Sequence, residues 1–316
     1  MNIEKLYSEQ NVTDIGVLRV ADADTFLKVA EGIYEPRDIF NGMLYEGECS
    51  ILFADTNSGK SILAVQIALN AAHELGMEVV YFDLELSTKQ FAQRYADSNG
   101  TINFPRGFHR AEINYERLAN CNNFEETIMQ SIEMTAINRM ANFIVVDNIT
   151  FLCLQSETGA DAGALMLRLL EIKRRLGITM LIVAHTPKRQ LHEPLTQNSL
   201  AGSKRLANFA DSIFAIGRSA KGENMRYIKQ IKSRNSSIEH GADNVIVAEI
   251  DRHDNMLQFA TLGCAHENEH LRSRPSSAKA DATQVLALHA EGLSMRDIAA
   301  KTNLSHMTVQ RIIKRS

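Results

Sequence analysis

The 316-residue sequence contains no uninterrupted apolar run long enough to cross a membrane, which argues against a membrane-spanning protein. The first residues, Met1 to Asp14, are polar and include acidic side chains, so they lack the apolar segment of a secretory signal peptide. The cysteines do not form a CxxC pair, a usage typical of reduced structural thiols. The four are Cys49, Cys121, Cys153 and Cys264. These absences predict a cytoplasmic protein without a membrane partner.

Charge is unevenly distributed along the chain. The formal net charge is −4. The segment from Leu271 to Ser316 contains eight Lys and Arg residues and three acidic residues, so this tail carries a net charge of +5 and the remainder of the chain carries −9. A basic tail on an acidic body favours contact with a polyanion such as DNA. The alternative is a solvated surface without a partner.

Between Pro36 and Gly263, apolar strand-like runs alternate with amphipathic helical stretches. The expected strands are Cys49–Ala54, Glu78–Asp83, Phe143–Asp147, Thr179–His185, Ser212–Gly217, Met225–Lys232 and Val245–Asp251. The expected helices are Lys60–Leu75, Thr88–Ala96, Ala162–Leu176 and Ser203–Asn208. This alternation predicts βαβ units and therefore an α/β fold, a mostly parallel sheet flanked by helices. The closely spaced last strands indicate an antiparallel extension.

The pattern divides the chain into four parts. We expect an N-terminal lead-in over residues 1–35 and a main α/β domain over 36–264. Residues 265–281 are polar and contain Pro275, which is typical of a linker. Residues 282–316 form a compact helical segment.

A phosphate-binding loop is the clearest motif in the sequence. The segment from Ala54 to Ser61 fits the spacing AxxxxGK[ST] and lies between a strand and a helix. Backbone N–H groups and the helix N-terminus attract phosphates there, and Lys60 would reach the β- and γ-phosphates. The alternative is a chance match, and Ala54 departs from the usual glycine. The expected nucleotide-binding residues are Ala54, Asp55, Thr56, Asn57, Ser58, Gly59, Lys60, Ser61 and Ile62.

A carboxylate at a second strand end completes the prediction of MgATP binding. Asp147 ends an apolar run and can hold Mg²⁺ through water, while the Ser61 hydroxyl takes another position on the ion. The next residue is Asn148, which cannot act as the general base. ATP and Mg²⁺ are therefore the expected cofactors, and Ser61 and Asp147 the expected metal ligands.

A candidate base follows the second strand. Ligands in parallel α/β sheets bind beyond the carboxyl ends of the strands, and both Asp83 and Glu85 lie at such an end. Glu85 is the preferred candidate because it lies nearer the carboxyl end, where it could orient the attacking water. The alternative is an ordinary exposed acid.

Together these motifs resemble the RecA-like ATPase core, in the branch of hexameric replicative helicases and RepA-like plasmid helicases. The resemblance covers roughly residues 36–263. It implies that Glu85 is catalytic and that His185 senses the nucleotide. It also implies that Lys232 and Arg234 form a KxR element, which reaches the γ-phosphate of a neighbouring subunit. For His185 the alternative is a hydrogen-bonded histidine at a strand end, and for the KxR element a basic turn.

The same resemblance implies a DNA-binding loop after the fourth core strand, from Leu191 to Ser203, that faces a central channel. The candidate phosphate contacts are Lys188, Arg189, Lys204 and Arg205. An ordinary polar surface loop is the alternative.

The C-terminal segment resembles the helix-turn-helix of resolvases and invertases. Its expected core consists of Val285, Leu288, Leu293, Ile298, Ala299, Leu304, Val309 and Ile312. In that resemblance the third helix enters the major groove of DNA. The expected DNA contacts are Ser305, His306, Thr308, Gln310, Arg311 and Lys314. A helical protein-interaction module is the alternative.

The sequence therefore predicts an oligomeric ATPase, with a hexamer as the expected ring, that associates with DNA and has a helicase-like role in a plasmid or mobile element. One alternative is a DNA-binding regulator in which ATP sets the oligomeric state without unwinding. Another is a nucleotide-binding protein with negligible turnover.

Overall fold

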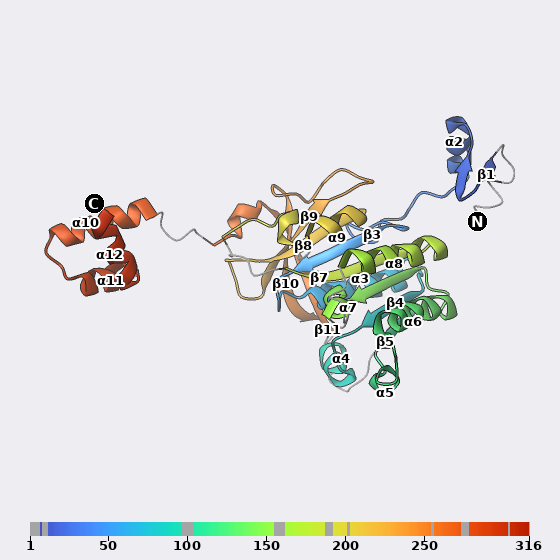
Figure 1. Cartoon of the computed structure of the whole chain (residues 1–316), viewed down its shortest axis with the longest axis horizontal. Helices are drawn as coiled ribbons and strands as arrows, with labels where there is room; N and C mark the ends of the chain where they lie inside the picture. The colour runs from blue at the N-terminus through green and yellow to red at the C-terminus, as the bar shows by residue number, and fades with distance from the viewer. Residues whose placement is uncertain are drawn as a thin grey trace.

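A long mixed sheet with helices on both faces organises the chain (Figure 1). The computed structural model describes residues 7, 12–96, 104–154, 162–186, 192–200, 203–253, 256–272, 278–302 and 304–315. Within these residues nine strands form the main sheet in the order β11-β10-β9-β8-β3-β7-β6-β4-β5. Their bounds are β3 Cys49–Ala54, β4 Val79–Asp83, β5 Phe108–Glu112, β6 Phe143–Asp147, β7 Thr179–His185, β8 Ser212–Arg218, β9 Met225–Lys232, β10 Val245–His253 and β11 Met256–Ala265.

The six strands from β5 to β8 in this order run parallel, and β9, β10 and β11 extend the sheet in antiparallel fashion. This confirms the predicted α/β architecture. The phosphate-loop strand β3 lies between β7 and β8, so Ala54 pairs with His185 on one side and with Ile216 on the other. The carboxyl ends of the parallel strands therefore meet at one edge of the sheet.

Helices cover both faces because the central strands are apolar on both sides. Every residue of β3 is buried, with Ile51 and Phe53 in one core cluster and Leu52 in the other. The helices are α2 Ala23–Glu31, α3 Lys60–Glu74, α4 Thr88–Tyr95, α5 Tyr115–Leu118, α6 Phe124–Asn138, α7 Ile149–Leu154, α8 Ala162–Leu176 and α9 Ser203–Phe209. Residues of α6 and α8 join the first cluster, and residues of α3 and α4 join the second.

Several elements lack a clear signal in the sequence. Strand β5 reads Phe-His-Arg-Ala-Glu and is only partly buried, since it forms the edge of the sheet. Strand β11, at the other edge, is mostly exposed. Neither contains the apolar run that predicts a buried strand. The lead-in before residue 36 contains a short hairpin of β1, Thr13–Ile15, and β2, Leu18–Val20, followed by α2.

The expected linker over residues 265–281 needs correction. Ala265 ends β11, and a short 3₁₀ helix, η2, follows at Glu267–Glu269. Glu267 and His270 are each only 1% exposed. Glu267 is buried because Lys229 donates a hydrogen bond to its Oε2 and the backbone N–H of Leu195 donates to its Oε1. The local composition does not show that Glu267 has a distant partner whose opposite charge compensates for its burial. Pro275 lies outside the described residues.

The C-terminal module forms a separate three-helix core. Its helices are α10 Ala278–Ala290, α11 Met295–Thr302 and α12 His306–Arg315. The predicted core is confirmed: Val285, Ile298 and Val309 are fully buried, and the other five expected residues pack around them. Ser294 caps α11, because its Oγ accepts a hydrogen bond from the backbone N–H of Asp297. Helix α10 begins four residues before the predicted start at Ala282, which shortens the linker further.

Among the described residues, no helix is long and apolar enough to span a bilayer.

Candidate functional site

The phosphate loop joins β3 to α3 through a backbone that requires glycine at one position. Gly59 caps α3 with φ = 97°, a left-handed conformation that side-chain-bearing residues rarely adopt. A Cβ atom there would lie 2.7 Å from Cδ1 of Ile250 and 2.9 Å from Cζ of Phe259. Ile250 of β10 and Phe259 of β11 therefore pack closely against the loop. The N-terminus of α3 lies at the end of the loop, where helix N-termini favour the binding of an anion.

Lys60 lies directly under the loop. It is only 7% exposed, and its Nζ donates hydrogen bonds to the carbonyl oxygens of Ala54 and Asp55, each at 3.1 Å. Burial lowers the pKa of Lys60, although the nearby carboxylates of Asp147 and Glu85 counteract this. Its ammonium group therefore lies where phosphates would approach, beside the loop and near the carboxylates of Asp147 and Glu85.

Two arginines, one on β8 and one on β9, donate hydrogen bonds to carbonyl oxygens of the phosphate loop. Arg218 Nη2 donates to the carbonyl oxygen of Thr56 at 2.7 Å, and Arg226 Nε donates to that of Ser58 at 3.2 Å. The two arginines are cross-strand partners. Sequence reasoning missed both, since each acts on a loop some 160 residues away and belongs to no local motif.

Asp147, the expected magnesium ligand, ends β6 beside the phosphate loop. It is 4% exposed, and the Tyr81 hydroxyl donates a hydrogen bond to its Oδ2 at 2.5 Å. Burial raises the pKa of Asp147, and hydrogen bonds from Ser61 and Tyr81 oppose that rise. The structure thus brings Ser61 and Asp147 together, as predicted. Two oxygen donors of this kind suit Mg²⁺, which completes its shell with water and substrate phosphates.

Glu85 follows β4 and faces the ends of β6 and β7. Asn148 Nδ2 donates to Glu85 Oε1 at 2.6 Å, and His185 Nε2 lies 3.8 Å from the same oxygen. Interaction with His185, followed by the hydrogen bond from Asn148, lowers the pKa of Glu85, which keeps the carboxylate ionised. Asn148 therefore fixes the direction of the Glu85 carboxylate. No local pattern in the sequence predicts that contact.

These residues line one pocket of about 320 Å³. Its lining combines the phosphate loop with the three strand ends that hold Glu85, Asp147 and His185. Arg94, Ile250 and Leu257 also line it and were not predicted. Ile250 and Leu257 add apolar surface to the pocket, whereas the phosphate-loop residues that line it are mostly polar.

Lys232 and Arg234 lie elsewhere. Lys232 pairs with Ile213 near the start of β8, whereas the end of β8 lies beside the phosphate loop. Lys232 Nζ donates to the carbonyl oxygens of Ala207 and Ala210, and Arg234 forms an ion pair with Asp211 at 2.9 Å. The structure therefore does not bring the KxR element to the nucleotide pocket of its own chain.

The predicted DNA contacts are only partly described. Lys188 and Arg189 lie outside the described residues, as do the side chains of Lys204 and Arg205. On α12, His306, Arg311 and Lys314 are exposed. Ser305 and Thr308 share a hydrogen bond of 2.8 Å at the start of that helix, and Gln310 is half-buried.

Together, the fold and the phosphate loop define a RecA-like P-loop ATPase. Residues 18–190 match the family model described as an AAA domain, and because that match covers more than half of the chain, the protein belongs to this family. Residues 279–316 match a homeodomain-like domain, which agrees with the helix-turn-helix geometry of α10 to α12.

One solved structure has a similar fold. The chain is similar to a KaiC-like protein from the hyperthermophilic archaeon Pyrococcus horikoshii OT3, with a TM-score of 0.51 and 16% identity. The match covers 69% of this chain and 91% of that one. At this identity the likeness concerns the fold alone. No curated protein shows significant similarity to the chain.

Proposed function

We propose that this protein hydrolyses MgATP as an oligomer associated with DNA, in a helicase-like or motor role during replication or mobilisation of a plasmid or mobile element. The observation that carries the proposal is the meeting of Lys60, Glu85 and Asp147 around one pocket. A cation for the phosphates, a carboxylate for the metal and a second, ionised carboxylate are the parts that ATP hydrolysis needs.

Each part has a separate task in this reaction. Lys60 and the N–H groups of the phosphate loop bind the β- and γ-phosphates. Ser61 and Asp147 would hold Mg²⁺, which neutralises charge on the phosphates. Glu85, held by Asn148, accepts a proton from the attacking water. His185 contacts both Glu85 and Asn148, so it is placed to register the loss of the γ-phosphate.

The proposed oligomer follows from the position of the KxR element. Lys232 and Arg234 lie near the start of β8, at the strand ends opposite those that carry their own phosphate loop. In a ring, expected to be a hexamer, they would reach the γ-phosphate bound by the next subunit and stabilise the charge that develops during transfer.

The first test compares ATP hydrolysis with and without single-stranded DNA, and measures strand displacement on a forked duplex. A helicase is expected to hydrolyse ATP several-fold faster with single-stranded DNA and to displace the strand, since its loops after β7 would bind the strand within the channel. An unchanged rate without displacement rejects the helicase role. It would favour the alternative of a DNA-binding regulator, which solution mass with and without a non-hydrolysable ATP analogue would then test.

A second test concerns the C-terminal module. Replacing Arg311 on the exposed side of α12 by Ala is expected to weaken binding of the full chain to duplex DNA about 10-fold. The slope of log affinity against log salt should fall by about 1 if the contact is to a phosphate. Fluorescence anisotropy at several salt concentrations measures both. Lys301→Ala, on exposed α11, is the control and should bind normally. Equal affinities for both variants would reject α12 as the DNA-contacting helix.

A further inference from the structure

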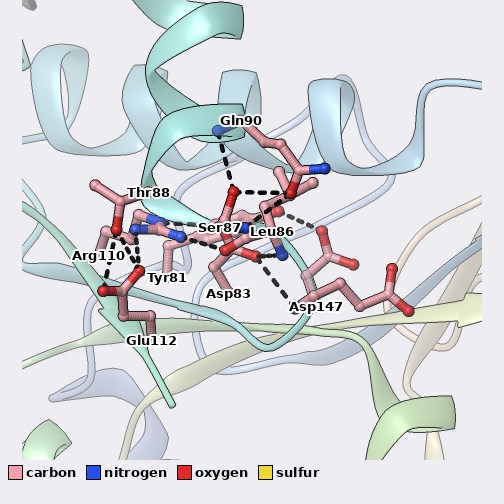
Figure 2. Close-up of polar contacts among 10 residues, drawn as sticks. Tyr81, Asp83, Leu86, Ser87, Thr88, Gln90, Arg110, Glu112 and Asp147 are labelled. Atoms are coloured by element: carbon pink, nitrogen blue, oxygen red, sulfur yellow. Dashed lines mark hydrogen bonds and ion pairs between the residues drawn. The ribbon is translucent and has the colours of Figure 1, made fainter. Parts of the chain in front are cut away.

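A polar network surrounds the loop that carries Glu85 (Figure 2). The loop connects β4 to α4 and consists of residues 84–87. Arg110, from the neighbouring edge strand β5, connects Asp83 and Leu86 with Glu112 in this network. No motif singles out Arg110, and it does not line the nucleotide pocket.

The first part of the network is a buried ion pair. Asp83 is 2% exposed, and Arg110 Nε donates to its Oδ2 at 2.9 Å. The other oxygen of Asp83 accepts the backbone N–H of Leu86 at 2.9 Å and that of Glu85 at 3.4 Å. Asp83 therefore closes the turn after β4 around the residue proposed as the base.

The second part is the fork of the Arg110 guanidinium. Its Nη2 donates to the carbonyl oxygen of Leu86 at 2.7 Å, and its Nη1 donates to Glu112 Oε2 at 2.7 Å. Leu86 is thus held through both its N–H and its C=O. Glu112 also accepts a hydrogen bond from the Thr88 hydroxyl at 2.8 Å, which ties the first residue of α4 to the same network.

The side chain of Glu85 has few contacts of its own. It is 47% exposed, Asn148 donates a hydrogen bond to its Oε1 at 2.6 Å, and His185 Nε2 lies 3.8 Å from the same oxygen. These two partners contact the end of the carboxylate, whereas the place from which the side chain leaves the main chain is set by the backbone on either side, which Asp83 and Arg110 hold. A misplacement of about 1 Å in a catalytic group can cost 10²-fold in rate.

We propose that Arg110 is a positioning residue for Glu85, acting through Asp83 and the backbone of Leu86. This inference rests on the proposed function of Glu85 as the base. It explains why a buried ion pair, which contributes little to stability by itself, is placed at the foot of an exposed loop.

Arg110→Lys is the informative variant. Lysine keeps the positive charge, but a single ammonium cannot serve Asp83, Glu112 and the Leu86 carbonyl in the planar fork geometry of arginine. We expect kcat for ATP hydrolysis to fall about 10-fold, while KM for MgATP changes little, because the phosphate loop is untouched. Arg106→Lys is the matched control: it makes the same change at an exposed arginine that precedes β5 and lies outside the network of Figure 2, so kcat should stay near the wild-type value.

A double-mutant cycle with Glu85→Gln separates positioning from a structural role. If Arg110 acts through Glu85, Arg110→Lys should cause no further loss of kcat in the Glu85→Gln background. An equal additional loss in that background overturns the inference, as does a variant with a lower melting temperature but normal kcat. Asp83→Asn provides a second route should Arg110→Lys fold poorly: it removes the ion pair but keeps an acceptor for Leu86, and normal kcat there also overturns the inference.

The failures of the two proposals are distinguishable. If Glu85→Gln hydrolyses ATP normally, the proposed function of Glu85 falls and this inference falls with it. If Glu85→Gln is slow while Arg110→Lys and Asp83→Asn are both normal, only the positioning role of Arg110 is overturned.

Discussion

Lys60→Ala is expected to lower kcat for ATP hydrolysis about 10³-fold. The Lys60 ammonium is the buried cation under the phosphate loop, where water screens it poorly. The substitution also removes its two hydrogen bonds to the carbonyl oxygens of Ala54 and Asp55, so the loop loses an internal support. Binding of MgATP should weaken as well, because the same charge contacts the ground-state phosphates.

Phosphate release at saturating MgATP measures the loss of turnover, and equilibrium binding of a fluorescent ATP analogue measures the loss of affinity. Lys89→Ala is the matched control, since Lys89 is exposed on the first turn of α4 and contributes nothing to the pocket. A Lys60→Ala protein that retained turnover within a few-fold of the wild type would contradict the proposed site.

Glu85→Gln is expected to lower kcat about 10²- to 10⁴-fold while MgATP still binds. Glutamine has the same shape as glutamate, and its amide oxygen can still accept the hydrogen bond from Asn148. It cannot accept a proton from water. The pKa of Glu85, lowered chiefly by His185, keeps the wild-type residue in the ionised form that a base requires.

Single-turnover hydrolysis with excess enzyme separates this effect from product release, and the same Glu-to-Gln change at Glu116, which is exposed on α5 and does not line the pocket, controls for the loss of one negative charge. Normal single-turnover rates in Glu85→Gln would show that another group activates the water. The pocket would then bind ATP, but no residue in it would be known to activate the water. That result would favour the alternative of a nucleotide-binding protein with little turnover.

The sequence predicts those parts of the candidate site that depend on a local pattern of residues. The phosphate loop, Asp147 and Glu85 each follow an apolar strand, and parallel strands must bring their carboxyl ends to one edge. The three-helix core of the C-terminal module was likewise readable, because its apolar spacing and the Ser294 cap lie within about thirty residues.

The rest of the site depends on contacts between distant segments. Arg226 donates a hydrogen bond to the carbonyl oxygen of Ser58 in the phosphate loop, and 168 positions of sequence separate the two residues. Arg110 contacts Asp83 from the edge strand β5, whose polar sequence does not predict a strand. The polar neighbours of Glu267 predict a linker, whereas the hydrogen bond from Lys229 makes its burial favourable. An isolated charged residue carries no local sign of the partner that it will meet.

Strand β9 links the nucleotide pocket to the opposite edge of the sheet. Its second residue, Arg226, holds the carbonyl oxygen of Ser58 in its own phosphate loop, and its last residue is Lys232. The strand has eight residues and so spans about 26 Å. Strand β8 pairs with β9 from Arg226 to Lys232, and β10 pairs with its first half, Met225 to Ile228. In the proposed ring, one strand therefore joins the phosphate loop of a subunit to the element that would contact the nucleotide of its neighbour, which is a direct covalent connection between the two sites.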